Sequence, residues 1–473
     1  MEVPGNTTKV YPYMPNTVPE IKEEMMKEIG IRSTEELFAD IPDDIRFKGK
    51  MNLPAPILSE SDLKRHVEGL LAKNISCEDA VSFLGAGCYH HYVPAVCDEI
   101  ANRSEFLTAY CGDTYSDHGK MQAIFEYCSM MAELLDLDVV SYTTFDGGQA
   151  VSSSLRMAIR ITGRNHLLLP RTINPEILSQ VRDYCKKVAD IELVAYDQKT
   201  GQLDLCDLER KISDKTAAVF IENPSYLGVL EEHGQEIADL AHRHGALFVV
   251  SVDPSSLGIL EPPAHYGADI VCGDIQPLGI HMNYGGGCAG FIATRDEKRF
   301  IEEYPTYLYG ITTTKRENEY GWGRALNWRT SHGSREKAKE YFGTSAGLYA
   351  ITAAVYMALM GPQGMRDLGC TIVQRAHYAK KLLGQIRGVR TDVFSSAVFK
   401  EFVVNFDGTG LTVRDINKKL LDYNIFGGKD LSQDFPELGQ SALYCVTELT
   451  TLENIKKLQD ALNSILGSRR CAS

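Results

Sequence analysis

The chain has 473 residues, of which 44% are hydrophobic and 24% are charged. This is the composition of an ordinary globular protein, and the length predicts two or three domains with a large buried core. The formal net charge of −14 and the sequence pI near 5.4 argue against a nucleic-acid-binding surface and against a basic membrane-binding patch.

The sequence predicts a cytoplasmic protein. No run approaches the roughly 20 consecutive apolar residues that a membrane-spanning helix needs. The first residues, "MEVPGNTTKVYPYMPNT", lack the charged region and apolar run of a secretory signal. The twelve cysteines include no C-x-x-C pair, so we expect reduced thiols with neither a disulfide framework nor a metal site.

The sequence predicts that residues 1–60 form an N-terminal helical arm that wraps the main domain or a partner. Two helical pieces are expected, at 19–29 and at 33–38. In the second, Ser33 and Glu36 have the spacing of a capping box. A polar, proline-bounded connector follows, after which Ser59 or Ser61 can cap the next helix.

The sequence of residues 61–330 predicts a large α/β domain. Its β-rich runs are continuously apolar, which is typical of strands that are buried on both faces of a mostly parallel sheet. Helical segments separate them, and one of these ends at Gly245. The runs are "HLLLP", "IELVAY", "TAAVFIEN", "ALFVVSVD", "ADIVCGD" and "AGFIAT".

Residues 331–473 predict a smaller α+β domain. Two long helices, broken at Gly361-Pro362, are followed by short strands and two further helices.

The stretch "GADIVCGDIQPLGIHMNYGGG", from Gly267 to Gly287, places a glycine-rich loop after a buried strand. Just upstream, Asp253 ends another apolar strand. Together these features resemble the cofactor pocket of pyridoxal-phosphate (PLP) enzymes, in which such an aspartate holds the pyridinium N–H. The alternative is an Asp-Pro turn that merely ends a strand. A PLP enzyme would carry its Schiff-base lysine near position 276, but this chain has Gln276.

Two other features bear on a cofactor. Gly147 and Gly148 precede a helix, and backbone N–H groups at a helix N-terminus suit a phosphate. The alternative is that any tight strand-to-helix turn favours glycine. Lys315 is the nearest lysine that could replace the missing one, but it follows no predicted strand.

The stretch "GAGCYHHYVP" predicts a flexible loop on the substrate side of the site, with His90 and His91 able to titrate near neutrality. Adjacent histidines on a strand face opposite ways, so a two-histidine metal site is not expected. We place Tyr110 on the same side. The stretch "NYGGGCAG" lets backbone come close to a ligand phosphate, in this chain or a neighbouring subunit, or to a neighbouring strand.

Longer runs resemble one family over nearly the whole chain. They include "FLGAGCYHHYVPAV", "NPSYLGVLE", "ALFVVSVDPSSLGILEPPAHYGADIVCGD" and "QPLGI". The chain is similar to the α subunit (subunit 1) of the two-subunit glycine dehydrogenase, the P-protein of the glycine cleavage system. The resemblance implies the aspartate aminotransferase-like fold type I of PLP enzymes.

The resemblance also implies how the work is divided between two chains. A lysine-bearing β subunit binds PLP, the two subunits form an α2β2 assembly, and Gln276 marks the half without the lysine. Glycine is decarboxylated, and its aminomethyl group passes to the lipoyl H-protein. Tyr284, Gly285 and Gly286 would lie near the partner's phosphate, and the His90 loop near the substrate.

Some positions depart from the family pattern, notably residues 111–120, Gly287-Cys288 and residues 339–341. Several of these fall on expected walls of the site. Two alternatives therefore stay open: a subunit of a paralogous PLP-dependent complex that acts on another amino acid, or a non-catalytic scaffold.

Overall fold

The computed structural model describes residues 10–11, 13–14, 17–49, 51–107, 118–286, 288–343 and 345–467. The chain divides into two units, Met1–Asn74 and Ile75–Ser473. The first unit therefore extends beyond the predicted arm of residues 1–60. Ile75–Ser473 is not divided further, so the predicted domain boundary near residue 330 stays a prediction.

The described residues of the first unit form short helices that bury no apolar core. None of them buries a residue, although apolar side chains such as Met25 and Leu70 are exposed on them. The Ser33 N–H donates to Glu36 Oε1 over 3.2 Å, and the Ser59 hydroxyl accepts the Asp62 N–H over 3.3 Å. These are the two caps expected from the sequence. The helices are α1 (Pro19–Ile29), the 3₁₀ helix η2 (Thr34–Phe38) and α2 (Glu60–Leu71).

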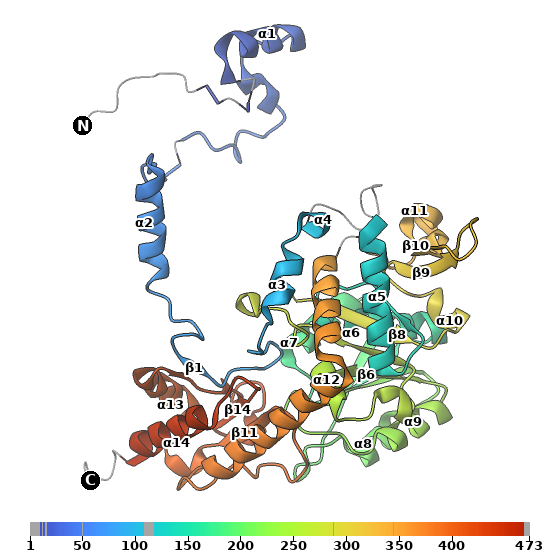
Figure 1. Ribbon diagram of the computed structural model, residues 1–473, viewed down its shortest axis with the longest axis vertical. Helices are drawn as coiled ribbons and strands as arrows, with labels where there is room; N and C mark the ends of the chain where they lie inside the picture. Colours follow the sequence, from blue (N-terminus) through green and yellow to red (C-terminus); the bar gives the residue numbers. More distant parts are fainter. Residues whose placement is uncertain are drawn as a thin grey trace. The chain divides into compact units, whose positions relative to one another are not determined.

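A seven-stranded sheet forms the centre of the second unit (Figure 1). Its order is β2-β8-β7-β6-β5-β3-β4, with parallel pairing from β4 through β7 and antiparallel pairing of β8 with β7 and β2. The predicted mostly parallel sheet is thereby confirmed. The strands are β2 (Val139–Val140), β3 (His166–Pro170), β4 (Asp190–Val194), β5 (Thr216–Glu222), β6 (Leu247–Val252), β7 (Ile270–Asp274) and β8 (Gly290–Thr294).

Helices cover both faces of this sheet, which explains the continuous apolar runs. Phe248 and Val250 of β6 belong to an apolar cluster that includes residues of α5, α9 and α12. Leu247 and Val249 of the same strand belong to a second cluster with residues of α6 and α7. The helices are α5 (His118–Leu135), α6 (Gly147–Thr162), α7 (Pro175–Cys185), α9 (Gly234–Arg243) and α12 (Gly347–Leu383).

Strand β4 differs from this pattern. It is an edge strand, and its residues alternate between more and less exposed up to the buried Val194. Its run "IELVAY" is therefore not buried on both faces along its whole length, because Glu192 is exposed on one of them.

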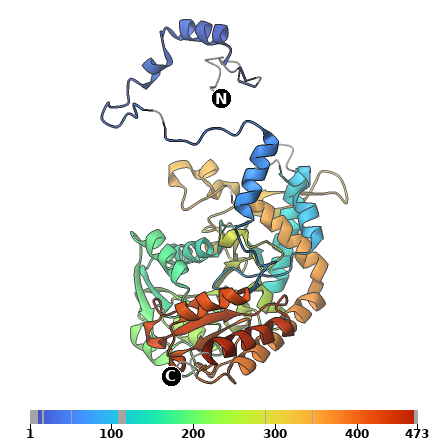
Figure 2. The same cartoon turned by 90° about the vertical axis from the view of Figure 1, so that its left-hand side faces the viewer.

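The C-terminal part carries a small antiparallel sheet of its own in the order β11-β14-β13. Long helix α12 leads into it and is kinked at Gly361, whose φ of 59° interrupts the helix at the predicted Gly361-Pro362 break. Figure 2 shows the red C-terminal elements gathered at one end of this unit. They are β11 (Glu401–Asn405), β13 (Lys429–Asp430), β14 (Ser441–Cys445), α13 (Val413–Leu420) and α14 (Leu452–Gly467). Across the described ranges, no helix is both long and apolar enough to cross a membrane.

Candidate functional site

Gln276 lies in the turn after β7, and its side chain is fully engaged by backbone groups. Its Nε2 donates to the carbonyl oxygens of Tyr89 and Ile280, each over 2.9 Å, and its Oε1 accepts the Tyr89 N–H over 3.0 Å. The residue is only 1% exposed. Both amide hydrogens and the amide oxygen are thus satisfied, so Gln276 holds the loop that contains Tyr89.

Asp253 ends β6 as expected, but its carboxylate is paired inside the chain. Oδ2 lies 2.5 Å from the Nζ of Lys400, a residue that is 3% exposed. Oδ1 accepts from the backbone N–H and the hydroxyl of Ser255 over 2.9 and 2.6 Å. Burial alone would raise the pKa of Asp253, but the Lys400 ammonium and Ser255 outweigh it and lower the pKa. The carboxylate is therefore ionised and neutralised by Lys400.

The ion pair continues through a buried histidine. Lys400 Nζ lies 2.8 Å from His91 Nε2, and His91 Nδ1 lies 2.7 Å from Glu448 Oε2. Burial and the Lys400 ammonium lower the pKa of His91. A neutral His91 that accepts from Lys400 at Nε2 and donates from Nδ1 to Glu448 has a hydrogen-bond partner at both ring nitrogens. The Lys400 ammonium also sits 3.9 Å from the centroid of the Tyr89 ring.

A second buried carboxylate holds the start of the same loop. Glu401 accepts the Ala86 N–H over 2.7 Å and the Tyr89 hydroxyl over 3.0 Å. Ala86 has a positive φ of 62°, and a Cβ on Gly85 would lie 2.5 Å from the Glu401 carboxylate. Loop 85–92 is therefore tied at many points, which corrects the prediction of a flexible loop.

The N-terminus of α6 is also occupied by protein groups. Gly147 N–H donates to Asp274 Oδ2 over 2.8 Å, and Gln149 N–H donates to Asp146 Oδ1 over 2.7 Å. A Cβ on Gly148 would lie 2.0 Å from the amide oxygen at the end of the exposed Gln180 side chain, which would have to move. Burial raises the pKa of Asp274 to about 7. Two carboxyl groups thus stand where a phosphate would have to bind.

These contacts test whether PLP fits the pocket of this chain. The cavity beside Asp253 and Asp274 has a volume of about 90 Å³, below the roughly 300–1,000 Å³ of typical ligand pockets. The pyridinium partner is paired with Lys400, the phosphate position faces carboxyl groups and the lysine position holds Gln276. The residues do not fit the cofactor. Asp253, Gly147 and Gly148 have partners within the chain in this structure, and the cofactor-binding role predicted for them stays a prediction.

Glu222, at the end of β5, lines the same cavity and gives a pH-dependent prediction. Burial raises its pKa from 4.5 to about 8. Between these values the folded chain keeps a proton that the unfolded chain releases, so the contribution of Glu222 to stability falls as pH rises through this window. We expect Glu222→Gln, which keeps an acceptor for the Asn174 N–H, to weaken this fall in the free energy of unfolding.

The measurement is urea unfolding of both proteins at pH values near the two ends of that window. The gain of the variant over the wild type should grow towards the alkaline end. Glu209→Gln, at an exposed position of helix α8 (Leu205–Lys211), serves as the control and should show no such growth. Parallel pH profiles for the wild type and Glu222→Gln would refute the assignment.

Tyr284, Gly285 and Gly286 form an exposed tip instead of a pocket wall. They belong to or follow the 3₁₀ turn η6 (Asn283–Gly285), and Tyr284 is fully exposed with a positive φ of 59°. Apart from the glycine itself and its chain neighbours, no described heavy atom lies within 4 Å of a Cβ built on Gly285 or Gly286. The tip is therefore free to meet another molecule, and its predicted contact with a partner's phosphate stays a prediction.

The structure separates the remaining predicted residues. His91 is buried, whereas His90 lines another cavity, of about 320 Å³, beside Thr450 and Asn454. Tyr110 and most of the divergent stretch 111–120 lie outside the described residues. Lys315 is exposed in the turn between β9 (Leu308–Thr313) and β10 (Tyr320–Ala325). Within the described part of the chain, no group of three or more His, Cys, Asp or Glu side chains is placed to hold a metal ion.

The sequence reasoning missed Lys400, Glu401 and Glu448. One signal was available, because "VFKEFVVNF" sets a lysine and a glutamate within a strand that is otherwise apolar. Charged residues are almost never fully buried unless they are paired. A buried ion pair of Lys400 could therefore have been expected, although the sequence does not indicate that Asp253 is the other member.

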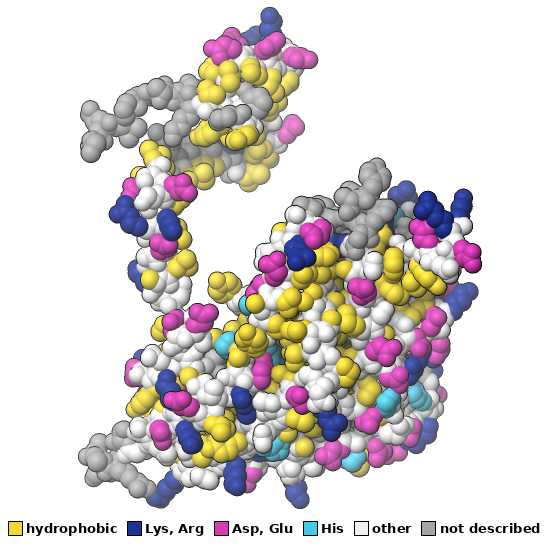
Figure 3. All heavy atoms as spheres, in the orientation of Figure 1, with side chains coloured by type: hydrophobic (Ala, Val, Ile, Leu, Met, Phe, Trp, Pro, Cys, Tyr) yellow, Lys and Arg dark blue, Asp and Glu magenta, His cyan; other side chains and the backbone are white. Residues whose placement is uncertain are grey.

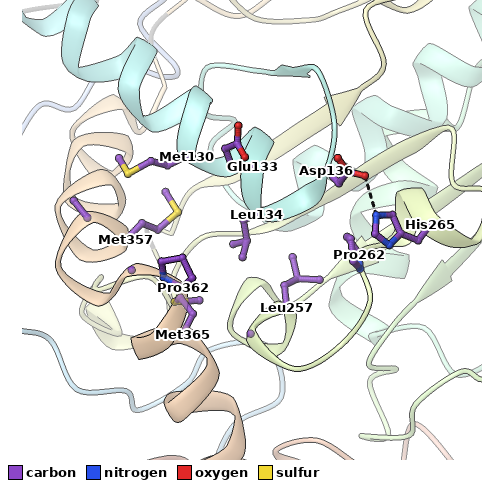
Figure 4. Close-up of a pocket in the computed structure, with 13 residues that line it drawn as sticks. Met130, Glu133, Leu134, Asp136, Leu257, Pro262, His265, Met357, Pro362 and Met365 are labelled. Atoms are coloured by element: carbon purple, nitrogen blue, oxygen red, sulfur yellow. Dashed lines mark hydrogen bonds and ion pairs between the residues drawn. The ribbon is translucent and has the colours of Figure 1, made fainter.

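A larger cavity, of about 790 Å³, lies between α5 and α12 at the Gly361 kink (Figure 4). Its lining is mostly apolar and rich in methionine, with Met130, Met357 and Met365 around it. At its rim, His265 Nε2 lies 2.8 Å from Asp136 Oδ2. This cavity shares no lining residue with the cavity beside Asp253.

Comparison with solved structures defines the class of protein. The chain is similar to a NifS-like protein from Rickettsia africae, with a TM-score of 0.61 and 14% identity over 82% of this chain and 99% of that chain. It is also similar to a sphingosine-1-phosphate lyase from Burkholderia pseudomallei, with a TM-score of 0.63 and 14% identity over 91% of this chain and 97% of that chain. At such identities the likeness shows the fold alone, which is fold type I of the PLP-dependent enzymes.

Closer similarities define the family. The family model of the glycine cleavage system P-protein matches residues 13–462. A crystal structure of glycine decarboxylase (P-protein) of the glycine cleavage system, in inhibitor-bound form, has a TM-score of 0.83 and 33% identity and covers 97% of this chain and 100% of that chain. The chain belongs to the glycine cleavage system P-protein family.

Among curated relatives, the chain is similar to proteins called probable glycine dehydrogenase (decarboxylating) subunit 1. The Staphylothermus marinus protein is 39% identical over 96% of this chain and 99% of its own length. The Carboxydothermus hydrogenoformans protein is 41% identical over 95% of this chain and 99% of its own length. The resemblance found in the sequence is thereby confirmed.

Proposed function

We propose that this chain is the lysine-free subunit of a two-chain, PLP-dependent glycine decarboxylase, and that a partner subunit binds the cofactor through its own lysine. The observation that carries the proposal is the state of Gln276. It is buried, its side-chain groups are all hydrogen-bonded to backbone, and near it Lys400 pairs with Asp253 and Asp274 accepts the Gly147 N–H. In the proposed subunit, the fold is that of a PLP enzyme, and the residue at the lysine position holds loop 85–92 in place of a cofactor.

Exposed apolar surface supports a partner of this kind. Figure 3 shows apolar side chains gathered over α5, α12 and the short helix α3 (Ala95–Ala101), where Val96 and Leu359 are exposed. Contiguous apolar surface of this kind is typical of protein interfaces. The helices of Met1–Asn74 bury no residue, which also suits an arm that packs on another protein. The relatives' designation "subunit 1" implies a second subunit, and the proposed PLP-bearing β subunit would be that partner.

In the proposed complex, bound PLP supplies the electron sink when glycine loses its carboxylate as CO2. The aminomethyl group then passes to the lipoyl H-protein. The contribution of this chain is to present the tip at Tyr284, held at its base by the network around loop 85–92, towards the partner's cofactor phosphate. We further propose an α2β2 assembly in the cytoplasm.

The experiment is reconstitution with a lysine-bearing P-protein β subunit. We expect the isolated full chain to lack the visible absorbance of a PLP Schiff base and to show no glycine–CO2 exchange. Exchange should appear on mixing with the β subunit, the lipoyl H-protein and PLP. PLP attached to the isolated chain after borohydride reduction would overturn the proposal. Exchange with another amino acid, but not with glycine, would instead select the paralogous complex.

A further inference from the structure

Cys88 and Cys288 lie together at the base of the exposed tip. Cys88 belongs to loop 85–92 and is half-buried, and its thiol donates to the carbonyl oxygen of Met282 over 3.4 Å. Met282 comes directly before the turn η6, and the buried Cys288 follows the tip and precedes β8. The Cys88 thiol is thus bonded to the segment that Cys288 ends, and the two thiols are hydrogen-bonded to each other.

The backbone on both sides of the pair is fixed to one short turn. Tyr89, which follows Cys88, exchanges hydrogen bonds of 3.0 and 2.9 Å with the side chain of Gln276. Ala289, which follows Cys288, accepts the Ile275 N–H over 2.8 Å. Ile275 and Gln276, consecutive residues of the turn, therefore anchor the residues that follow the two cysteines.

The environment makes the two thiols unequal. The hydrogen bond from Cys288 lowers the pKa of Cys88, against the effects of burial and of Asp274. The same bond, together with burial, raises the pKa of Cys288. A more exposed cysteine of lowered pKa next to a buried cysteine of raised pKa is the arrangement of an attacking cysteine and a resolving cysteine.

We propose that Cys88 and Cys288 form a redox-active dithiol that small-molecule disulfides oxidise to an intramolecular disulfide bond. The Cys88 thiolate attacks one sulfur of the small disulfide, breaks its S–S bond and releases one thiolate. Cys288 gives its proton to that thiolate and attacks the Cys88 sulfur, which releases the second small thiolate. This thiolate takes up the proton that Cys88 lost to water when it ionised. Two protein thiols are oxidised, one small disulfide is reduced, and the protons end on the two released thiols.

The new bond would join two loops that are now held only by hydrogen bonds. One is loop 85–92, and the other is the tip that carries Tyr284. Since we propose that this tip meets the partner's cofactor, the disulfide would restrain a segment needed for the proposed function. The dithiol itself does not depend on that function.

The test is peptide mapping of the full-length isolated chain after exposure to oxidised glutathione without denaturant. Free thiols are blocked with N-ethylmaleimide, and the chain is digested with trypsin without reduction. Cys88 falls in peptide 74–103 and Cys288 in peptide 244–295. Because these peptides also hold Cys77, Cys97 and Cys272, fragment ions must locate the bond.

We expect one cross-linked species that joins these peptides through Cys88 and Cys288 and disappears on reduction. It should be lost in Cys88→Ser and in Cys288→Ser, and retained in the matched control Cys206→Ser/Cys370→Ser, which removes two exposed thiols. Glutathione on Cys206 and Cys370 without the cross-link would overturn the proposal, as would a bond to any other cysteine. The wild-type fragment ions decide the result even where a variant fails to fold.

Discussion

Replacing Lys400 with methionine should lower the free energy of unfolding by about 3–5 kcal/mol, the usual cost of removing one partner from a buried ion pair. Asp253 would keep its charge in a buried site, with only Ser255 to hydrogen-bond it. His91 Nε2 would also lose its donor. Urea unfolding of the isolated chain, followed by circular dichroism, measures the change.

The double variant Asp253→Asn/Lys400→Met tests the cause. Removing both charges of a buried pair is often nearly neutral, so the double variant should recover most of the loss. Lys298→Met removes a lysine from an exposed pair with Glu302 and should cost no more than about 0.5 kcal/mol. A double variant as unstable as Lys400→Met would show that packing, and not the unpaired carboxylate, sets the cost.

Replacing Gly286 with valine should lower glycine–CO2 exchange by the reconstituted complex about 100-fold or more, the scale of loss when a site is displaced by an ångström. Stability of this chain should not change. Gly286 has an extended φ of −141°, which any residue adopts, and no heavy atom lies within 4 Å of a Cβ there. The valine can therefore act only on a molecule that approaches the tip.

Gly323→Val in β10 is the matched control, because a Cβ there also meets nothing within 4 Å. It should leave both exchange activity and stability unchanged. Exchange rates of the complex, PLP affinity and urea unfolding of the single chain separate the effects. Full activity of Gly286→Val with unchanged PLP affinity would exclude the tip from the shared site.

Much of the large domain followed from local patterns. The continuous apolar runs of β6 and β7 predict strands covered on both faces, and the helices on either side of the sheet bear this out. The kink at Gly361 and the cap at Ser59 depend on residues adjacent in sequence. Such features are predictable because the interactions that make them span only a few positions.

What the sequence by itself determined is the identity of the fold and the absence of a lysine at position 276. Tertiary structure alone decided which groups surround Asp253 and His91. Lys400 and Glu448 come from the C-terminal part of the chain, yet they meet Asp253 and His91 of the large sheet and its loop. No local pattern specifies such pairs, because burying a charge is tolerable only where folding supplies its partner.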